Sequence, residues 1–81
     1  MDKEQIKKEL EPIFLEVFSL DNIEITDDLN AEKVERWDSL THFSMIAKVE
    51  DFFNVKFKLK ELIAMKNVGD MIALIETKTN A

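Results

Sequence analysis

Residues 37–53 read WDSLTHFSMIAKVEDFF and carry the pattern on which the fold prediction depends. Asp38 and Ser39 are residue types that favour a helix N-terminus, because their side chains accept hydrogen bonds from its free backbone N–H groups. Apolar residues then recur with the period of an amphipathic helix. They are Leu40, Phe43, Ile46, Ala47, Val49 and Phe53. The stretch predicts a helix that starts at Asp38-Ser39, continues to about residue 53 and is closed by Asn54.

Residues 3–18, on the N-terminal side of this helix, form a second amphipathic pattern. Its apolar members are Ile6, Leu10, Ile13, Phe14, Val17 and Phe18. Pro12 lies inside the pattern, and a proline there removes one backbone hydrogen bond. We therefore expect a first helix over 3–18 with a kink or a boundary at Pro12.

Residues 19–37, between the two helices, show no sustained periodicity. Connections longer than about 12–15 residues are uncommon in compact domains and are usually functional or disordered. Apolar residues punctuate this one at Leu20, Ile23, Ile25, Leu29, Val34 and Trp37. These anchors favour an ordered, functional loop packed on the helices.

Residues 54–81 predict the remaining elements. Residues 55–57 read as an extended connector, and the apolar residues from Leu59 to Met65 indicate a short third helix. Asn67 with Asp70 three positions later resembles a helix-starting cap, so a last helix follows, and residues 77–81 read as a flexible tail. The expected fold is all-α: a four-helix bundle with three longer helices, one short helix and a long loop between the first two. Its predicted core is Ile6, Leu10, Phe14, Ile46, Val49, Phe53, Leu62, Ile72 and Ile75.

Length and composition exclude several classes of protein. The 81 residues suit one domain, residues 1–81, and the net charge of −6 disfavours binding to the phosphates of a nucleic acid. No cysteine is available for disulfides or common zinc sites, and no apolar run approaches the roughly 20 residues of a membrane span. The N-terminus does not resemble a secretion signal. We expect a cytoplasmic monomer without a membrane partner.

No metal site is expected either. Residues 21–32 begin and end like a calcium-binding loop, but Ile23, Ile25 and Thr26 occupy positions that need oxygen ligands or glycine. A single histidine, His42, without cysteine does not provide a zinc ligand set.

Charge is distributed unevenly along the chain. Residues 19–38 hold seven acidic residues against Lys33 and Arg36. Residues 56–66 hold four lysines against Glu61. Such asymmetry steers encounters with charged partners more than it stabilises a fold.

The string Trp37-Asp38-Ser39-Leu40 joins the acidic loop to a helix that ends in Glu50-Asp51-Phe52-Phe53. In this context the sequence resembles the acyl and peptidyl carrier protein family. In that family the serine of an Asp-Ser-Leu motif receives 4′-phosphopantetheine at the start of the second of four helices. Val68-Gly69-Asp70 also resembles the family's opening of its last helix. The resemblance covers about residues 4–76.

The resemblance implies a carrier that is not itself an enzyme. Ser39 would be the attachment site of 4′-phosphopantetheine from coenzyme A, with Asp38 and Leu40 completing the motif. The position suits an anion, because a helix N-terminus favours negative charge. His42 is three residues further along the same helix and no third orienting group is evident, so Ser39 lacks the arrangement of a catalytic nucleophile. Another enzyme must activate it.

The resemblance also implies the partners: a phosphopantetheinyl transferase and the acyl-loading and acyl-transfer enzymes of one pathway. Docking would use the loop and the second helix, through Leu40, Ser44, Ala47, Glu50 and Asp51. Carriers of primary metabolism usually place more acids after the serine. In this sequence fewer acidic residues follow Ser39, because the segment contains Thr41, His42, Ser44 and Lys48. Fatty acid, polyketide, aminoacyl and surface-glycan pathways therefore all stay open.

Some alternatives concern the whole chain. A carrier-like domain that is never modified could serve as an adaptor or subunit, and a small helical regulator could bind a partner helix. Others concern single residues. Asp38 either only caps the helix or also acts in the motif. Trp37 is expected to anchor the loop, with contact to the cargo as the alternative, and His42 is expected to face solvent or a partner. Three methionines either fill the core or line a path for an acyl chain: Met45, Met65 and Met71.

Overall fold

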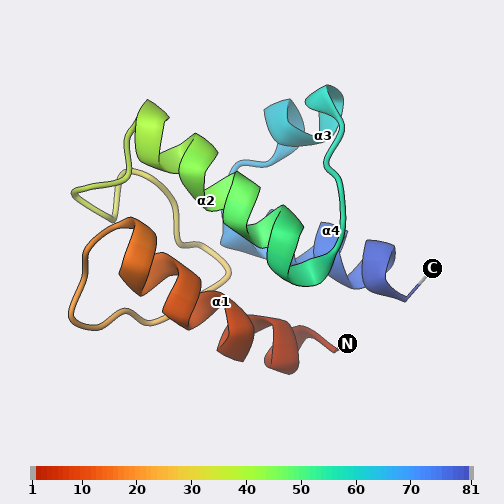
Figure 1. Ribbon diagram of the computed structural model, residues 1–81, viewed down its shortest axis with the longest axis horizontal. Coiled ribbons are helices and arrows are strands. Elements are labelled where there is room, and N and C mark those ends of the chain that lie inside the picture. The colour runs from red at the N-terminus through yellow and green to blue at the C-terminus, as the bar shows by residue number, and fades with distance from the viewer. Residues whose placement is uncertain (1, 81) are drawn as a thin grey trace.

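The computed structural model describes residues 2–80, which form four α-helices and no strand (Figure 1). These are α1 (Lys3–Val17), α2 (Ser39–Phe53), α3 (Leu59–Ala64) and α4 (Val68–Thr79). The three longer helices pack together. The short α3, which follows α2 and precedes α4 in the sequence, lies at one edge of the molecule. The predicted all-α class, the three longer helices and the long loop between the first two are confirmed.

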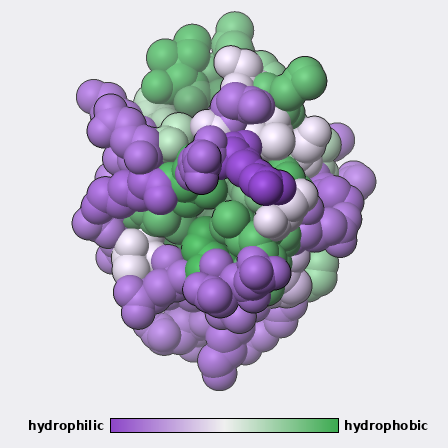
Figure 2. Space-filling model, turned by 90° about the vertical axis from the view of Figure 1, so that its left-hand side faces the viewer, coloured by the Kyte–Doolittle hydropathy of each residue, from purple (hydrophilic) through white to green (hydrophobic). Residues whose placement is uncertain are grey.

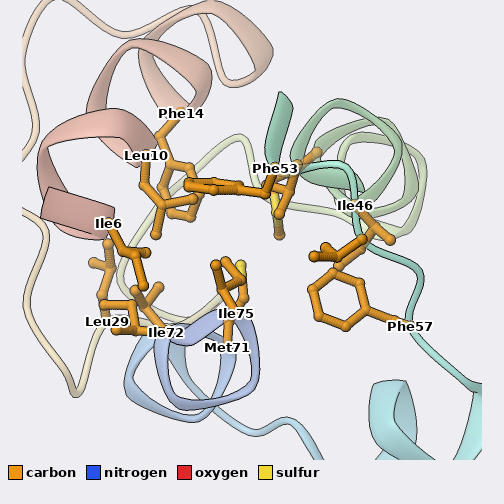
Figure 3. Close-up of a cluster of buried hydrophobic side chains, with 14 of the residues drawn as sticks. Ile6, Leu10, Phe14, Leu29, Ile46, Phe53, Phe57, Met71, Ile72 and Ile75 are labelled. Atoms are coloured by element: carbon orange, nitrogen blue, oxygen red, sulfur yellow. The ribbon is translucent and has the colours of Figure 1, made fainter. Parts of the chain in front are cut away.

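The core forms where α1, α2 and α4 meet, with side chains from all three helices pointing toward one another (Figure 3). Leu29 from the loop and Phe57 from the connector after α2 complete it. Eight of the nine predicted core residues are buried, and the ninth, Leu62, is partly buried and packs against the others. Met45 and Met71 fill the interior, while Met65 is only partly buried.

Helix α1 runs without interruption through Pro12, so the expected boundary there is wrong. Its N-cap is Asp2, which accepts a hydrogen bond from the backbone N–H of Gln5 at 2.9 Å. The proline removes one backbone bond on an exposed side of the helix. The fully buried Leu10 and Phe14 on either side of it hold the helix against the core.

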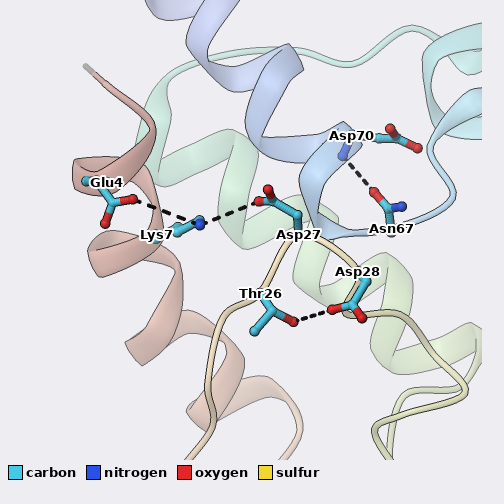
Figure 4. Close-up of polar contacts among 7 residues, drawn as sticks. All are labelled: Glu4, Lys7, Thr26, Asp27, Asp28, Asn67 and Asp70. Atoms are coloured by element: carbon cyan, nitrogen blue, oxygen red, sulfur yellow. Dashed lines mark hydrogen bonds and ion pairs between the residues drawn. The ribbon is translucent and has the colours of Figure 1, made fainter.

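The loop over residues 19–37 is anchored as the sequence predicts. Leu29 and Val34 are buried, and four further apolar residues pack against the core. They are Leu20, Ile23, Ile25 and Trp37. Lys7 of α1 pairs with Asp27 of the loop at 3.5 Å, which joins the loop to the first helix as well (Figure 4).

The start of α4 is held by this loop. The backbone N–H groups of Val68 and Gly69 each donate to a loop carbonyl at 2.8 Å, those of Leu29 and Asp27 respectively. The Asn67 side chain accepts from the backbone N–H of Asp70 at 2.9 Å, which confirms the predicted cap (Figure 4). The first N–H groups of a helix have no partner within the helix, so these contacts satisfy all three.

The end of α4 differs from the prediction. Residues 77–79 belong to the helix, so a tail beginning at residue 77 is wrong for these three positions. The hydroxyl of Thr79 donates to the carbonyl of Ile75 at 2.8 Å, and Lys78 pairs with Glu61 of α3 at 3.0 Å. Side-chain contacts with another helix thus extend α4 beyond its apolar pattern. Residue 81 of the predicted tail lies outside the described residues.

Over residues 2–80, no helix combines the length and the apolar character needed to cross a bilayer.

Candidate functional site

Ser39 is the first residue of α2, and its side chain is exposed at the point where the acidic loop ends. Within residues 2–80, no group forms a hydrogen bond with its hydroxyl or with its backbone N–H. Both groups therefore face solvent at the positive end of the helix dipole. The structure thus brings Asp38, Ser39 and Leu40 together at one exposed corner.

Asp38 and Thr41 fix the backbone around Ser39. Asp38 is the N-cap, and its carboxylate accepts from the backbone N–H of Thr41 at 3.0 Å. The Thr41 hydroxyl accepts from the backbone N–H of Asp38 at 2.8 Å and donates to the carbonyl of Arg36 at 2.7 Å. The bonds from the Thr41 backbone N–H and then its hydroxyl hold the pKa of Asp38 below the usual value. Asp38 therefore stays ionised while it caps the helix.

Trp37 anchors the residues just before Ser39, as expected. Its ring packs nearly parallel to Phe18, with centroids 5.0 Å apart, and edge-on to Phe14 at 5.6 Å. Its indole N–H donates to Nδ1 of His42 at 2.9 Å. His42 thus contacts the loop through Trp37 in addition to lining the surface beside Ser39, a contact that was not predicted from the sequence. Its ring is half-buried, and burial lowers the pKa of His42.

An open groove of about 430 Å³ lies beside Ser39. Its lining is mostly apolar or aromatic apart from the motif: Ala31, Trp37, Asp38, Ser39, His42 and Phe43. Leu40 and Phe43, at 70% and 65% exposed, add apolar surface at this end of α2. Figure 2 shows apolar groups at the top and in the middle of this side of the molecule, with hydrophilic groups around them and over the lower part. The groove can therefore accept a chain that carries both polar and apolar groups.

The predicted partner residues do not all share one surface. Leu40, Ser44, Ala47 and Asp51 are exposed and follow a four-three-four spacing, which places them along one face of α2. Glu50 lies off this stripe and is half-buried, because its carboxylate accepts from the backbone N–H of Phe57 at 2.9 Å. The structure thus gives Glu50 a role in holding the connector to α3.

Two lysines near the candidate site are already paired. Lys48 of α2 contacts Glu16 of α1 at 2.7 Å, and Lys33 contacts Asp28 within the loop at 2.7 Å. Lys33 is the main reason that the pKa of Asp28 is lowered. In the part of the chain that the structure describes, no group of three or more acidic, histidine or cysteine side chains could hold a metal ion.

The sequence interpretation missed the roles of Thr41 and His42. Thr41 stands three residues after Asp38, which is the spacing of a capping box, and this signal was present. The contact between Trp37 and His42 spans five residues across the start of a helix. No sequence pattern indicates it, because the loop must first fold against α1 to place the indole.

Known proteins resemble this chain over nearly its whole length. It is 34% identical to an acyl carrier protein of Exiguobacterium over 96% of the chain and 99% of that protein. An acyl carrier protein of Streptococcus pyogenes is 33% identical over 94% of the chain and 82% of its own length. No protein-family model matches the chain.

The fold also matches that of a solved structure. The solution structure of holo acyl carrier protein from Geobacter metallireducens superposes with a TM-score of 0.83 and 41% identity, over 88% of this chain and 82% of that one. The four helices, the long anchored loop and full-length relatives above 30% identity lead to one conclusion: the chain belongs to the acyl carrier protein family.

Proposed function

We propose that Ser39 carries 4′-phosphopantetheine derived from coenzyme A, and that acyl or aminoacyl intermediates are bound to it as thioesters. The pathway would be fatty acid, polyketide or related specialised biosynthesis, and the carrier unit would be residues 1–81. The exposed Ser39 hydroxyl, free of hydrogen bonds from residues 2–80 at the head of a capped helix, supports the proposal best. The similar protein from Geobacter metallireducens is described as a holo form.

The residues around Ser39 suit this group. A phosphodiester on the hydroxyl would lie at the N-terminus of α2, where backbone N–H groups and the helix dipole stabilise negative charge. Asp38 would hold the motif in place through its cap, and Leu40 and the groove walls Trp37 and Phe43 would contact the apolar parts of the arm. When bound, the group supplies a thiol that forms thioesters, which are reactive acyl donors.

The attachment requires a second protein. The hydroxyl oxygen of Ser39 would attack the pyrophosphate of coenzyme A, and the P–O bond to the nucleotide part would break as the transferase accepts the serine proton. His42 cannot replace the transferase as base, because its Nδ1 already accepts from Trp37 and no orienting group forms a triad with Ser39. The phosphopantetheinyl transferase is thus the first proposed partner.

The proposed docking face is the exposed stripe of α2 formed by Leu40, Ser44, Ala47 and Asp51, together with the end of the loop. Acyl-loading and acyl-transfer enzymes of the pathway would use the same face. Glu50 contributes to it through the position of the connector to α3, since its carboxylate already binds Phe57. On this face Leu40 is apolar, Ser44 and Ala47 are small, and Asp51 is acidic. Such a face fits a partner surface that is apolar at its centre and basic around it.

Incubation of the apo protein with coenzyme A and a transferase, followed by mass measurement of the intact protein, tests the proposal. We expect a gain of one phosphopantetheinyl group, because the Ser39 hydroxyl is accessible. Ser39→Ala should show no gain. Ser44→Ala removes an equally exposed hydroxyl from the same helix and should be modified like the wild type.

The other outcomes separate the alternatives. A gain in Ser39→Ala would place the modification elsewhere and refute the proposed site. Failure of the wild type, with a transferase that modifies another carrier in the same assay, would favour a carrier-like adaptor that is never modified.

A further inference from the structure

Trp37 and His42 form a pair that holds the two sides of the candidate site together. The indole N–H of Trp37 lies 2.9 Å from Nδ1 of His42, and the two ring planes differ by 18° with centroids 6.0 Å apart. An indole N–H lies in the plane of its ring, so an acceptor at this distance must lie close to that plane. The rings therefore meet edge to edge, not face to face.

This geometry requires a neutral His42. Nδ1 must keep its lone pair to accept the indole proton, so Nε2 carries the hydrogen of the neutral ring. Protonation would turn Nδ1 into a donor facing another donor. It would also place a positive charge against the edge of the indole, which is the positive part of its quadrupole. Cation–π attraction gives no compensation here, because it acts at the ring face.

The pair bridges elements on both sides of Ser39. Trp37 packs on Phe14 of α1 and on Phe18, which caps the end of α1, and His42 lies in the first turn of α2. A second hollow, of about 140 Å³ and more enclosed than the groove beside Ser39, lies against the same pair. Both hollows are lined by Ala31, Trp37 and His42. The pair is therefore the shared wall between the surface at Ser39 and a hollow that reaches the buried Met71.

We propose that His42 is a positioning residue: in its neutral form it holds Trp37, and with it the loop in front of Ser39, and its protonation releases this hold. The candidate site at Ser39 and the shared wall would then be ordered above the pKa of His42 and loosened below it. This inference concerns the side chains around Ser39 and does not depend on whether Ser39 is modified.

The surroundings of His42 agree with this dependence on protonation. Among the residues that line the two hollows, the charged ones are Asp38 before α2 and Lys66 before α4. Asp38 keeps its negative charge while it caps the helix and favours protonation of a nearby ring, whereas Lys66 opposes a second positive charge there. The other elements present uncharged groups there, such as Phe43 of α2 and Met71 of α4. Burial lowers the pKa of His42, in the same direction as the hydrogen bond.

The sequence makes the pair directly observable, because it contains one tryptophan, one histidine and no tyrosine. The indole N–H signal in a nitrogen-edited NMR spectrum and the tryptophan fluorescence both report on Trp37 alone. We expect both to change with one midpoint, equal to that of the His42 ring protons and below the usual value of about 6.5. The His42 ring protons, followed in the same titration, assign the step to His42. A tryptophan signal that stays constant through the His42 titration would overturn the proposal.

Two substitutions distinguish positioning from packing. His42→Phe keeps a flat ring of similar size but has no acceptor, so the pH step should disappear. Exchange of the indole proton with solvent should become roughly five-fold faster, the factor that corresponds to a net hydrogen bond of about 1 kcal/mol. His42→Asn keeps an acceptor that does not titrate and should restore slow exchange without the pH step. Equal exchange rates in the wild type and His42→Phe would contradict the proposed role.

Unfolding measurements give an independent readout with a defined sign. The folded state has the lower pKa, so the unfolded chain binds the proton first as the pH falls. The free energy of unfolding should be constant above about pH 6.5 and decrease as the pH falls through the folded pKa, and this decrease should be absent in His42→Phe. The same decrease in both proteins would assign it to other groups and refute the inference.

The consequence for Ser39 is a pH-dependent presentation of its hydroxyl. The kcat/KM for modification by a transferase should decrease with the midpoint of the Trp37 signal in the wild type. In His42→Asn this decrease in kcat/KM should be absent. The remaining pH dependence of the variant is that of the transferase itself, and it serves as the reference for the wild type. If Ser39 is never modified, the proposed function fails while the NMR and unfolding results still decide the role of His42. If modification occurs and both proteins have identical pH profiles, the coupling to Ser39 is refuted.

Discussion

At the scale of single residues, neighbouring phenylalanines near the end of α2 have opposite environments. Phe53 is 7% exposed and faces the core, whereas Phe52 is 52% exposed. Successive side chains are rotated by about 100° around the helix, and this rotation turns the ring of Phe52 away from α1 and α4. The two rings still contact each other edge-on with centroids 5.0 Å apart. Both positions hold phenylalanine, but the two side chains are therefore expected to contribute differently to stability.

Phe53→Ala should reduce the free energy of unfolding by about 3–5 kcal/mol, because it removes a buried ring and leaves a cavity. Small domains are stable by only about 5–15 kcal/mol, so the variant would be close to unfolding. Phe52→Ala is the matched control and should cost less than about 1.5 kcal/mol, mainly through the lost ring contact. Urea denaturation of the three proteins measures both values. An unchanged midpoint for Phe53→Ala would remove this residue from the core.

Residue roles were predictable where they depend on local sequence. The cap at Asp38 follows from residue type at a helix start, and the anchor at Trp37 follows from its large apolar ring. The Glu50 contact was not predictable, because it requires knowing that Asn54 adopts a left-handed conformation and returns the chain so that Phe57 meets α2. His42 is similar: its partner Trp37 belongs to a loop that packs on Phe14 of α1 and on Phe18 at the end of α1.

At the scale of elements, the junction between the loop and α4 depends on the one glycine of the chain. Gly69 donates to the carbonyl of Asp27 at 2.8 Å, and a Cβ at Gly69 would lie 2.9 Å from that oxygen and 3.0 Å from the Cβ of Asp27. Real Cβ atoms do not approach other atoms that closely, so the two backbones could not keep this contact. The glycine is thus required for close approach, and it lets the loop cover the helix start.

Gly69→Ala should therefore destabilise the protein by about 1–3 kcal/mol, as overpacking does. Helix propensity alone predicts the opposite sign, a gain of up to about 1 kcal/mol. Ala73→Gly, at an exposed position of α4, measures propensity within the same helix and should cost about 1 kcal/mol. Amide exchange of Val68 and residue 69 should also become faster in Gly69→Ala. If that variant is more stable than the wild type, the contact with Asp27 does not limit this position.

Helix starts were predicted better than helix interiors and ends. Asp38 and Asn67 indicate where α2 and α4 begin, because capping is a local interaction within three residues. The possible boundary at Pro12 and the end of α4 were misjudged for the opposite reason. The buried neighbours of Pro12 and the pair between Lys78 and Glu61 are tertiary contacts, which override local preference.

At the scale of the whole molecule, exposed acidic side chains outnumber basic ones in the loop before Ser39, although the exposed Arg36 adds one positive charge there. Lys33 and Lys48 are the lysines of the loop and of α2, and both already contact carboxylates. Their charges are thus partly compensated within the chain. Exposed acids such as Glu32, Glu35 and Asp51 stay available to a partner near Ser39. A basic partner surface would meet this side by long-range attraction before any close contact forms.

Binding to the phosphopantetheinyl transferase should consequently be weak and sensitive to salt, because exposed charges in a transient interface act mainly on the rate of encounter. The association rate, measured by surface plasmon resonance, should decrease by roughly tenfold or more as ionic strength rises from about 0.05 to 0.5 M, while dissociation changes little. Asp51→Asn removes one charge from the proposed docking face and should slow association. Glu11→Gln makes the same charge change at an exposed position of α1 and should have a smaller effect. Association that is indifferent to salt, or equal effects of the two substitutions, would show that the acidic side does not guide docking.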